Sequence, residues 1–148
     1  MTTMYSFARE AGHRLKVPLS TEPDKAAAQL KERLEELKLT HDHFRVYVEE
    51  ATVVVVGDSA MQDQKERIVL ALGNTEGVTE VEDRVEAGQE DIAARFLTVR
   101  DGETLEDVAA RAYDTPDAVR RLLAANHPVL TGPDDICAGL VVRAPAAT

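Results

Sequence analysis

The strongest constraint on the fold of this chain is a pair of strand-forming segments separated by two residues. Residues 44–49 alternate apolar with polar side chains, as a strand with one buried face requires. Glu50 and Ala51 separate this segment from a β-branched run at 52–56. Two such segments joined by a short connection predict a β-hairpin.

Helical patterns flank the predicted hairpin. Before it, leucines at 30, 34 and 37 repeat at four and three residues, which predicts a helix over 24–39. After it, residues 59–62 have the S-x-x-Q form of a capping box, with Ser59 as the cap. The helix that follows is expected to end at Gly73 and Asn74. A third strand over 78–85 completes an αββαβ domain, which we place at 24–87.

The first 23 residues are expected to form a short helical segment and a linker. Residues 5–12 predict a helical turn, with Gly12 as the residue just past its end. Pro18 and Pro23 then prevent a continuous helix, because each pushes its preceding residue out of the helical region.

The rest of the chain predicts a βααβ domain over 96–146, joined by a linker at 88–95. Strands are expected over 96–100 and 140–144. Thr104 and Asp107 form a second capping-box pattern at the start of one helix. Thr115 followed by Pro116 marks the start of the other, which ends near Asn126. The fold class is therefore α+β, with two small domains.

Charge limits the partners that this chain can have. It has 148 residues, with 27 acidic and 17 basic side chains and a formal net charge of −10. Phosphate backbones and anionic lipid surfaces repel such a chain, so we expect neither nucleic acid nor membrane as a partner.

Targeting signals and catalytic motifs are also missing from the sequence. The first residues show no basic region followed by an apolar one, so we expect a cytoplasmic protein. A single cysteine, Cys137, excludes an intramolecular disulfide, and we expect its side chain to be buried. Neither a glycine-rich phosphate loop nor a Ser/His/Asp set is recognisable, so we expect a non-enzyme.

The C-terminal domain resembles the LysM family. Residues 96–105, 108–109, 123–126 and 136–145 carry the resemblance. Gly102 suits the sharp turn from strand to helix, and Asn126 is expected to bond backbone groups in the turn that follows it.

The domain at 24–87 resembles the BON family, through residues 46–57 and 72–81. A BON domain followed directly by a LysM domain resembles a family of bacterial cytoplasmic potassium-binding proteins, and residues 7–12 resemble its N-terminal segment. The resemblance implies a monomeric, non-enzymatic protein that binds K⁺ and compacts when it does. Rb⁺ or Cs⁺ would be possible substitutes.

Potassium is a weakly hydrated cation that a cage of backbone carbonyls can hold. The end of a helix offers such carbonyls together with a partial negative charge. Gly12 and Gly73 mark two predicted helix ends, and positive φ angles at Gly73 and Gly77 would turn carbonyls inward. The site requires the N-terminal segment to pack against the loop at 73–78. By resemblance, the ligands are the carbonyls of Ala8, Ala11, His13, Gly73, Thr75 and Val78.

Two other functions stay open. A LysM domain can bind polymers of N-acetylglucosamine, and its groove here would lie between residues 101–104 and 126–130. The candidate residues for that groove are Asp101, Gly102, Glu103, Thr104, Asn126 and His127. A membrane-associated BON module is the other alternative, which the net acidity disfavours.

Overall fold

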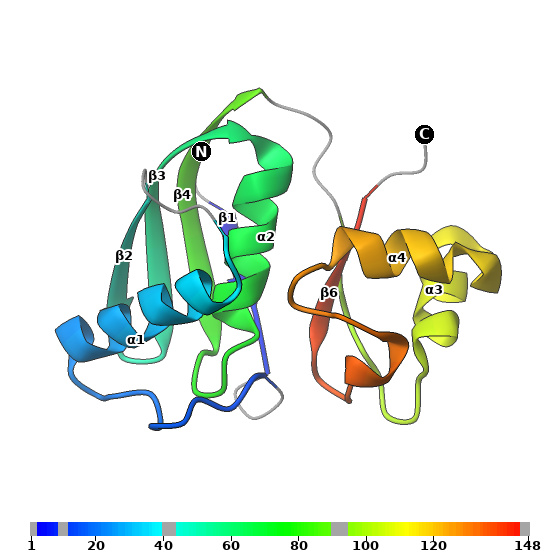
Figure 1. The fold of residues 1–148 in the computed structure, drawn as a ribbon, viewed down its shortest axis with the longest axis horizontal. Coiled ribbons are helices and arrows are strands. Elements are labelled where there is room, and N and C mark those ends of the chain that lie inside the picture. Colours follow the sequence, from blue (N-terminus) through cyan, green and yellow to red (C-terminus); the bar gives the residue numbers. More distant parts are fainter. Residues whose placement is uncertain (1–2, 9–11, 40–43, 90–94, 146–148) are drawn as a thin grey trace.

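The computed structural model describes residues 3–8, 12–39, 44–89 and 95–145. They form two α+β units that lie side by side (Figure 1). We call residues 3–89 the N-terminal unit and residues 95–145 the C-terminal unit. Each unit has a sheet of its own, with four strands in the first and two in the second.

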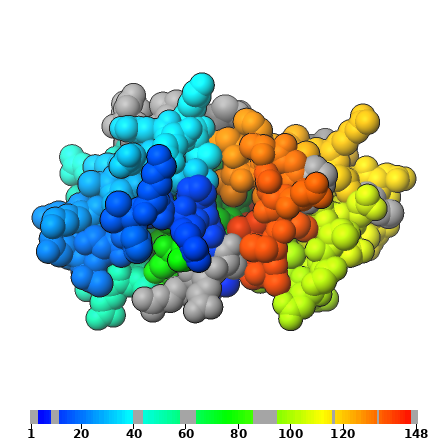
Figure 2. Space-filling model, turned by 60° about the horizontal axis from the view of Figure 1, so that its bottom comes forward, coloured from blue at the N-terminus to red at the C-terminus, as the bar shows by residue number. Residues whose placement is uncertain are grey.

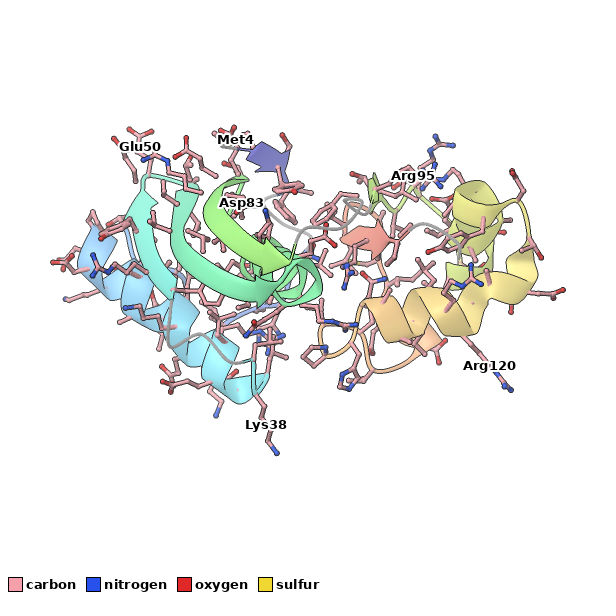
Figure 3. All side chains as sticks on the ribbon, turned by 90° about the horizontal axis from the view of Figure 1, so that it is seen from above. Met4, Lys38, Glu50, Asp83, Arg95 and Arg120 are labelled. Atoms are coloured by element: carbon pink, nitrogen blue, oxygen red, sulfur yellow. The ribbon has the colours of Figure 1, made fainter. Side chains whose placement is uncertain are left out.

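The N-terminal unit is a sheet with two helices packed on it. Its elements are β1 (Thr3–Ser6), α1 (Pro23–Glu36), β2 (Phe44–Glu49), β3 (Thr52–Met61), α2 (Gln62–Gly73) and β4 (Glu80–Gln89). The strand order is β1-β4-β3-β2, in which β3 and β4 are parallel and the other pairs antiparallel. Both helices lie on one side of the sheet, whereas Met4 lies on the side away from α1 (Figures 1 and 3). From α1 to β4 the elements follow the order that the sequence predicts.

The predicted hairpin is confirmed. Strands β2 and β3 pair from Phe44 opposite Gly57 to Glu49 opposite Thr52. Phe44, Val46 and Val48 are buried, and the residues between them are exposed. The alternation in the sequence therefore places one face of β2 on the core.

The N-terminal segment is a strand, and the predicted helical turn is wrong. Strand β1 pairs antiparallel with β4, with Tyr5 opposite Val81, and Phe7 is buried in the core. The edge of β4 offers unpaired backbone groups, and pairing with this distant strand overrides the local preference of the segment. Residues 9–11 of the predicted turn lie outside the described residues.

The predicted start of α2 is also wrong. Ser59 is a strand residue that pairs with Ala87 in the parallel ladder of β3 and β4, and the helix begins at Gln62. Pairing with β4 satisfies the backbone groups of this stretch, so it continues the strand and does not start a helix. The ladder also carries β4 to Gln89, so the first two residues of the predicted linker at 88–95 belong to a strand.

The C-terminal unit is a two-stranded sheet covered by helices. Its elements are β5 (Arg95–Thr98), α3 (Leu105–Tyr113), the 3₁₀ turn η1 (Pro116–Ala118), α4 (Val119–Ala125), the 3₁₀ turn η2 (Pro133–Asp135) and β6 (Val141–Ala144). The capping box is confirmed: the Asp107 N–H donates to Thr104 Oγ1 at 3.2 Å, and the Thr104 N–H donates to Asp107 Oδ2 at 2.9 Å. Gly102 has a φ of +77°, as its sharp turn requires.

The two units meet at α2 and at β1. Val141 of β6 packs into the core of the N-terminal unit, and Tyr5 stacks on Phe96 with ring centroids 4.4 Å apart. Between them, Arg143 of β6 forms an ion pair with Glu66 of α2 at 3.1 Å. Both side chains are nearly inaccessible, at 4% and 3% exposure. A buried charge without its partner is costly, so removal of either residue of this pair is expected to destabilise the docked form.

We expect Glu66→Ala to lower the free energy of unfolding by about 3–5 kcal/mol, because it leaves the Arg143 guanidinium buried without its carboxylate. Denaturant unfolding measures the change. Lys25→Ala is the control, since it breaks the exposed ion pair between Lys25 and Glu22 and is expected to cost about 0–1 kcal/mol. Equal losses in the two variants would contradict the structural role of the buried pair.

Phe7 attaches the N-terminal segment to the end of α2. A Cβ atom added at Gly73 would lie 2.1 Å from Cζ of the Phe7 ring. The glycine is therefore required by the close approach of the ring, and its backbone is helical.

Gly73→Ala is expected to lower the free energy of unfolding by about 1–3 kcal/mol, because the ring must move out of a packed core. Thermal melts measure the loss. Gly132→Ala is the matched control, since no atom lies within 4 Å of the added Cβ there. Melting at the wild-type temperature in Gly73→Ala would show that Phe7 does not pack on this helix end.

Candidate functional site

The N-terminal segment and the loop after α2 are tied together at two places. We call residues 73–78 the carbonyl loop. Just beyond it, the Thr79 carbonyl accepts a hydrogen bond from the Phe7 N–H at 2.8 Å. At the other end, the His13 N–H donates to the Asn74 carbonyl at 2.6 Å, and the Glu76 N–H donates to the His13 carbonyl at 2.8 Å. The two segments therefore pack together, as the site expected from the sequence requires.

The end of α2 leaves acceptor groups at this place. The Leu70 carbonyl accepts from the Asn74 N–H at 2.9 Å, and the Ala71 carbonyl accepts from Thr75 Oγ1 at 3.0 Å. Within the described part of the chain, no donor reaches the carbonyls of Gly73 and Val78. The last turn of α2 has no basic residue to offset the partial negative charge of the helix end. This end of the helix can therefore attract a cation.

Glycines allow the close approach, although two of the three act differently from the prediction. Gly77 has a φ of +105°, as expected. Gly73 is helical and does not have the positive φ that the sequence analysis expected. Gly12 follows no described helix, but a Cβ there would lie 2.4 Å from the carbonyl carbon of Asn74. Contact, and not a helix cap, explains Gly12.

The expected ligand residues are placed as follows. Ala8 is exposed and directly follows the anchored Phe7, whereas Ala11 lies outside the described residues. His13 and Thr75 form an isolated parallel bridge. The Thr75 carbonyl accepts from the Val78 N–H at 3.1 Å, and the His13 carbonyl accepts from Glu76, so each has one lone pair left for another partner. Thr75 and Val78 are fully buried.

The C-terminal unit borders the same region. A cavity of about 350 Å³ is lined by Gly12, His13 and Asn74 on one side and by Leu130, Asp135 and Cys137 on the other. Figure 2 shows the N-terminal segment, in blue, next to the orange and red part of the C-terminal unit. Cys137 is exposed, so the expected burial of its side chain is wrong.

The basic side chains near the site are either neutral or paired with carboxylates. Burial lowers the pKa of His13 below its usual value and the charge of Arg33 lowers it further, while Glu36 acts in the opposite direction. The His13 imidazole is therefore neutral at pH 7. Arg33 pairs with Glu36 at 3.6 Å, and Arg14 pairs with Glu76 of the carbonyl loop at 3.4 Å. Carboxylates thus accompany the positive groups that surround the loop.

Three of the six residues expected to form a glycan groove are engaged within the fold, and the other three are exposed. Glu103 forms an ion pair with Arg111 at 2.8 Å, and Thr104 caps α3. Gly102 and Asp101 lie in the exposed turn before Glu103, and His127 is exposed. Asn126 is completely buried. Its side chain bonds Leu122 and Arg143 and not the following turn, so the expectation for this residue is wrong.

Asn74 is the residue of this region that sequence reasoning missed. Its side-chain amide donates to the Val141 carbonyl at 2.6 Å and its side-chain oxygen accepts from the Val141 N–H at 3.0 Å. The sequence shows an asparagine after a glycine at a helix end, which predicts a stop signal and nothing more. The partner strand lies 67 residues away in the chain, so no local pattern could reveal it.

The described residues contain no group of three or more His, Cys, Asp or Glu side chains that could hold a metal ion. Nor does any helix within the described ranges have the length and hydropathy of a membrane span. Any ion held at the carbonyl loop would thus be bound chiefly by backbone groups.

Comparison with known proteins identifies the family. Residues 24–89 match the BON domain family, which covers most of the N-terminal unit. The whole chain is similar to the potassium binding protein Kbp of Escherichia coli O6:H1 (strain CFT073), with 30% identity over 145 residues. The alignment covers 96% of this chain and 97% of the relative. An alignment that spans both units at this identity shows that the chain belongs to the Kbp family of BON-domain proteins.

Proposed function

We propose that this protein is a cytoplasmic, non-enzymatic potassium-binding protein that works as a monomer. The observation that carries the proposal is the attachment of the N-terminal segment to the carbonyl loop at the end of α2. The name of the E. coli relative, a potassium binding protein, supports the identity of the ion. The cytoplasmic location follows the expectation from the sequence.

The ion in this proposal is dehydrated and held by backbone carbonyls. The ligands are those of Ala8, Ala11 and His13 from the N-terminal segment, and of Gly73, Thr75 and Val78 from the carbonyl loop. Carbonyl oxygens can replace the hydration shell of K⁺, and the end of α2 adds its partial negative charge. Rb⁺ and Cs⁺ have the same charge and are the natural substitutes to test.

The proposal includes a conformational response. We take the C-terminal unit to be a LysM domain, which its βααβ order and the Thr104 capping box support. Both proposed domains are acidic and repel one another when they are undocked. A ligand shifts such an equilibrium only if it binds one state more tightly. K⁺ would therefore bind the docked form, in which the C-terminal unit borders the site, more tightly than the open one, and the molecule would compact.

We expect K⁺ to stabilise the fold. A ligand that binds only the native state adds about 2.7 kcal/mol at a hundredfold excess over its Kd. Thermal melts in KCl should therefore lie several degrees above melts in NaCl at equal ionic strength, and calorimetry should detect K⁺ but not Na⁺. RbCl and CsCl test the two substitutes. Identical melts in KCl and NaCl, with no heat of K⁺ binding, would refute the proposed function.

We expect Gly12→Ala to weaken K⁺ binding about tenfold or more, which corresponds to about 1.4 kcal/mol. Its Cβ would lie 2.4 Å from the Asn74 backbone, so the N-terminal segment must move away from the carbonyl loop. Calorimetric titration with KCl measures the change. Gly132→Ala serves as the control because its Cβ meets open space. Wild-type affinity in a folded Gly12→Ala protein would place the ion elsewhere.

A further inference from the structure

We propose that Asn74 is the positioning residue that couples the ion site to the docking of the C-terminal unit. The inference rests on the proposed function, because it assigns a role to a side chain within the carbonyl loop. The proposal is that Asn74 transmits the arrangement of the carbonyl loop to β6.

The first step is the free edge of β6. In an antiparallel pair, alternate residues turn their N–H and C=O groups away from the partner strand. Val141 and Arg143 are these residues in β6, because their backbone groups bond asparagine side chains. Asn126 serves Arg143 from within the C-terminal unit, at 2.7 and 3.0 Å. Asn74, from the other unit, bonds the N–H and the carbonyl of Val141, as a neighbouring strand would do.

The second step is the place of Asn74 in the chain. It lies between Gly73 and Thr75, two residues whose carbonyls are proposed to bind the ion. Its own carbonyl accepts from the His13 N–H, and its N–H donates to Leu70 at the end of α2. The backbone of Asn74 therefore cannot rotate without moving both segments of the proposed site. Its side chain is 4% exposed, so it has no solvent in which to find other partners.

The third step separates Asn74 from the other contacts between the units. Arg67 Nη1 donates to the carbonyls of Ala124 and His127, and Glu66 pairs with Arg143. Both residues lie within α2, before its last turn and outside the carbonyl loop. They hold the units together whatever the loop does. Asn74 alone among these residues belongs both to the interface and to the loop.

The coupling has a defined direction. When the loop carbonyls surround an ion, the Asn74 side chain is held where it can bond both backbone groups of Val141. When the loop rearranges, these two groups lose their partners inside an interface, which disfavours docking. By linkage, docking strengthens ion binding by the same factor as the ion strengthens docking.

The test compares full-length wild type with Asn74→Ala and Arg67→Ala, which remove the hydrogen bonds between the units that are described above for each residue. Small-angle scattering gives the radius of gyration in KCl and in NaCl at equal ionic strength, and calorimetry gives the K⁺ affinity. In wild type and in Arg67→Ala, the radius should be smaller in KCl. In Asn74→Ala that difference should vanish, and the Kd for K⁺ should rise about 5- to 150-fold, the usual range of coupling between sites.

A second variant guards against loss of folding in Asn74→Ala. Asn74→Leu removes both hydrogen bonds to Val141 and fills the buried space that Asn74→Ala leaves empty. We expect it to reduce the difference between the two salts as Asn74→Ala does. Tyr113→Phe is the control, since it removes a hydrogen bond from a side chain to a backbone carbonyl within the C-terminal unit and should keep the difference.

The outcomes separate this inference from the proposed function. A wild-type protein that binds no K⁺ in calorimetry overturns both. Binding of K⁺ without a difference in radius overturns only the coupling. A difference in radius between KCl and NaCl as large as that of wild type in Asn74→Ala or Asn74→Leu also refutes the role of Asn74 and leaves the ion site standing. Loss of this difference in Arg67→Ala as well has the same meaning.

Discussion

The proposed site depends on the C-terminal end of α2. A helix leaves its last carbonyls without partners inside the helix, and something else must satisfy them or use them. Here the Asn74 N–H and the Thr75 hydroxyl donate to the carbonyls of Leu70 and Ala71, which satisfies two of the last four carbonyls of α2. The Phe7 ring lies over Gly73, and the N-terminal segment is bonded to the loop that follows. The helix end is thus the place at which three distant parts of the chain meet.

Docking of the two units satisfies backbone groups at one edge of β6. The C-terminal unit has a core of its own, but the edges of its two-stranded sheet expose unpaired backbone groups. In this protein the free edge of β6 is satisfied by one asparagine from its own unit and one from the carbonyl loop of the other. Val141 also contributes to the core of the N-terminal unit. The C-terminal unit is therefore stabilised by docking, and docking can respond to what happens at the end of α2.

The sequence predicted the elements whose signals are local. The alternation over 44–49, Leu30 and Leu34 of α1 and the Thr104 capping box each describe an interaction within a few residues, and the structure contains all three. The predicted end of α1 at residue 39 is wrong, because the helix stops at Glu36 and Lys38 has a positive φ. The other failures share one cause. β1 is a strand because it pairs with β4 about 75 residues later, and Ser59 is a strand residue because it pairs with Ala87. Asn74 was missed for the same reason, since its partner is Val141.

A site built from backbone carbonyls is not revealed by the side chains of its ligand residues. The side chains at Ala8, His13 and Thr75 matter little to a carbonyl cage, so their identities could not reveal one. What the cage does require is close approach of two segments, and that requirement falls on Gly12 and Gly73, where an added methyl group would collide with Asn74 and Phe7. These glycines resemble ordinary helix caps in the sequence. They become informative only when the neighbour that excludes a side chain is known, which is a property of the folded molecule and not of the local sequence.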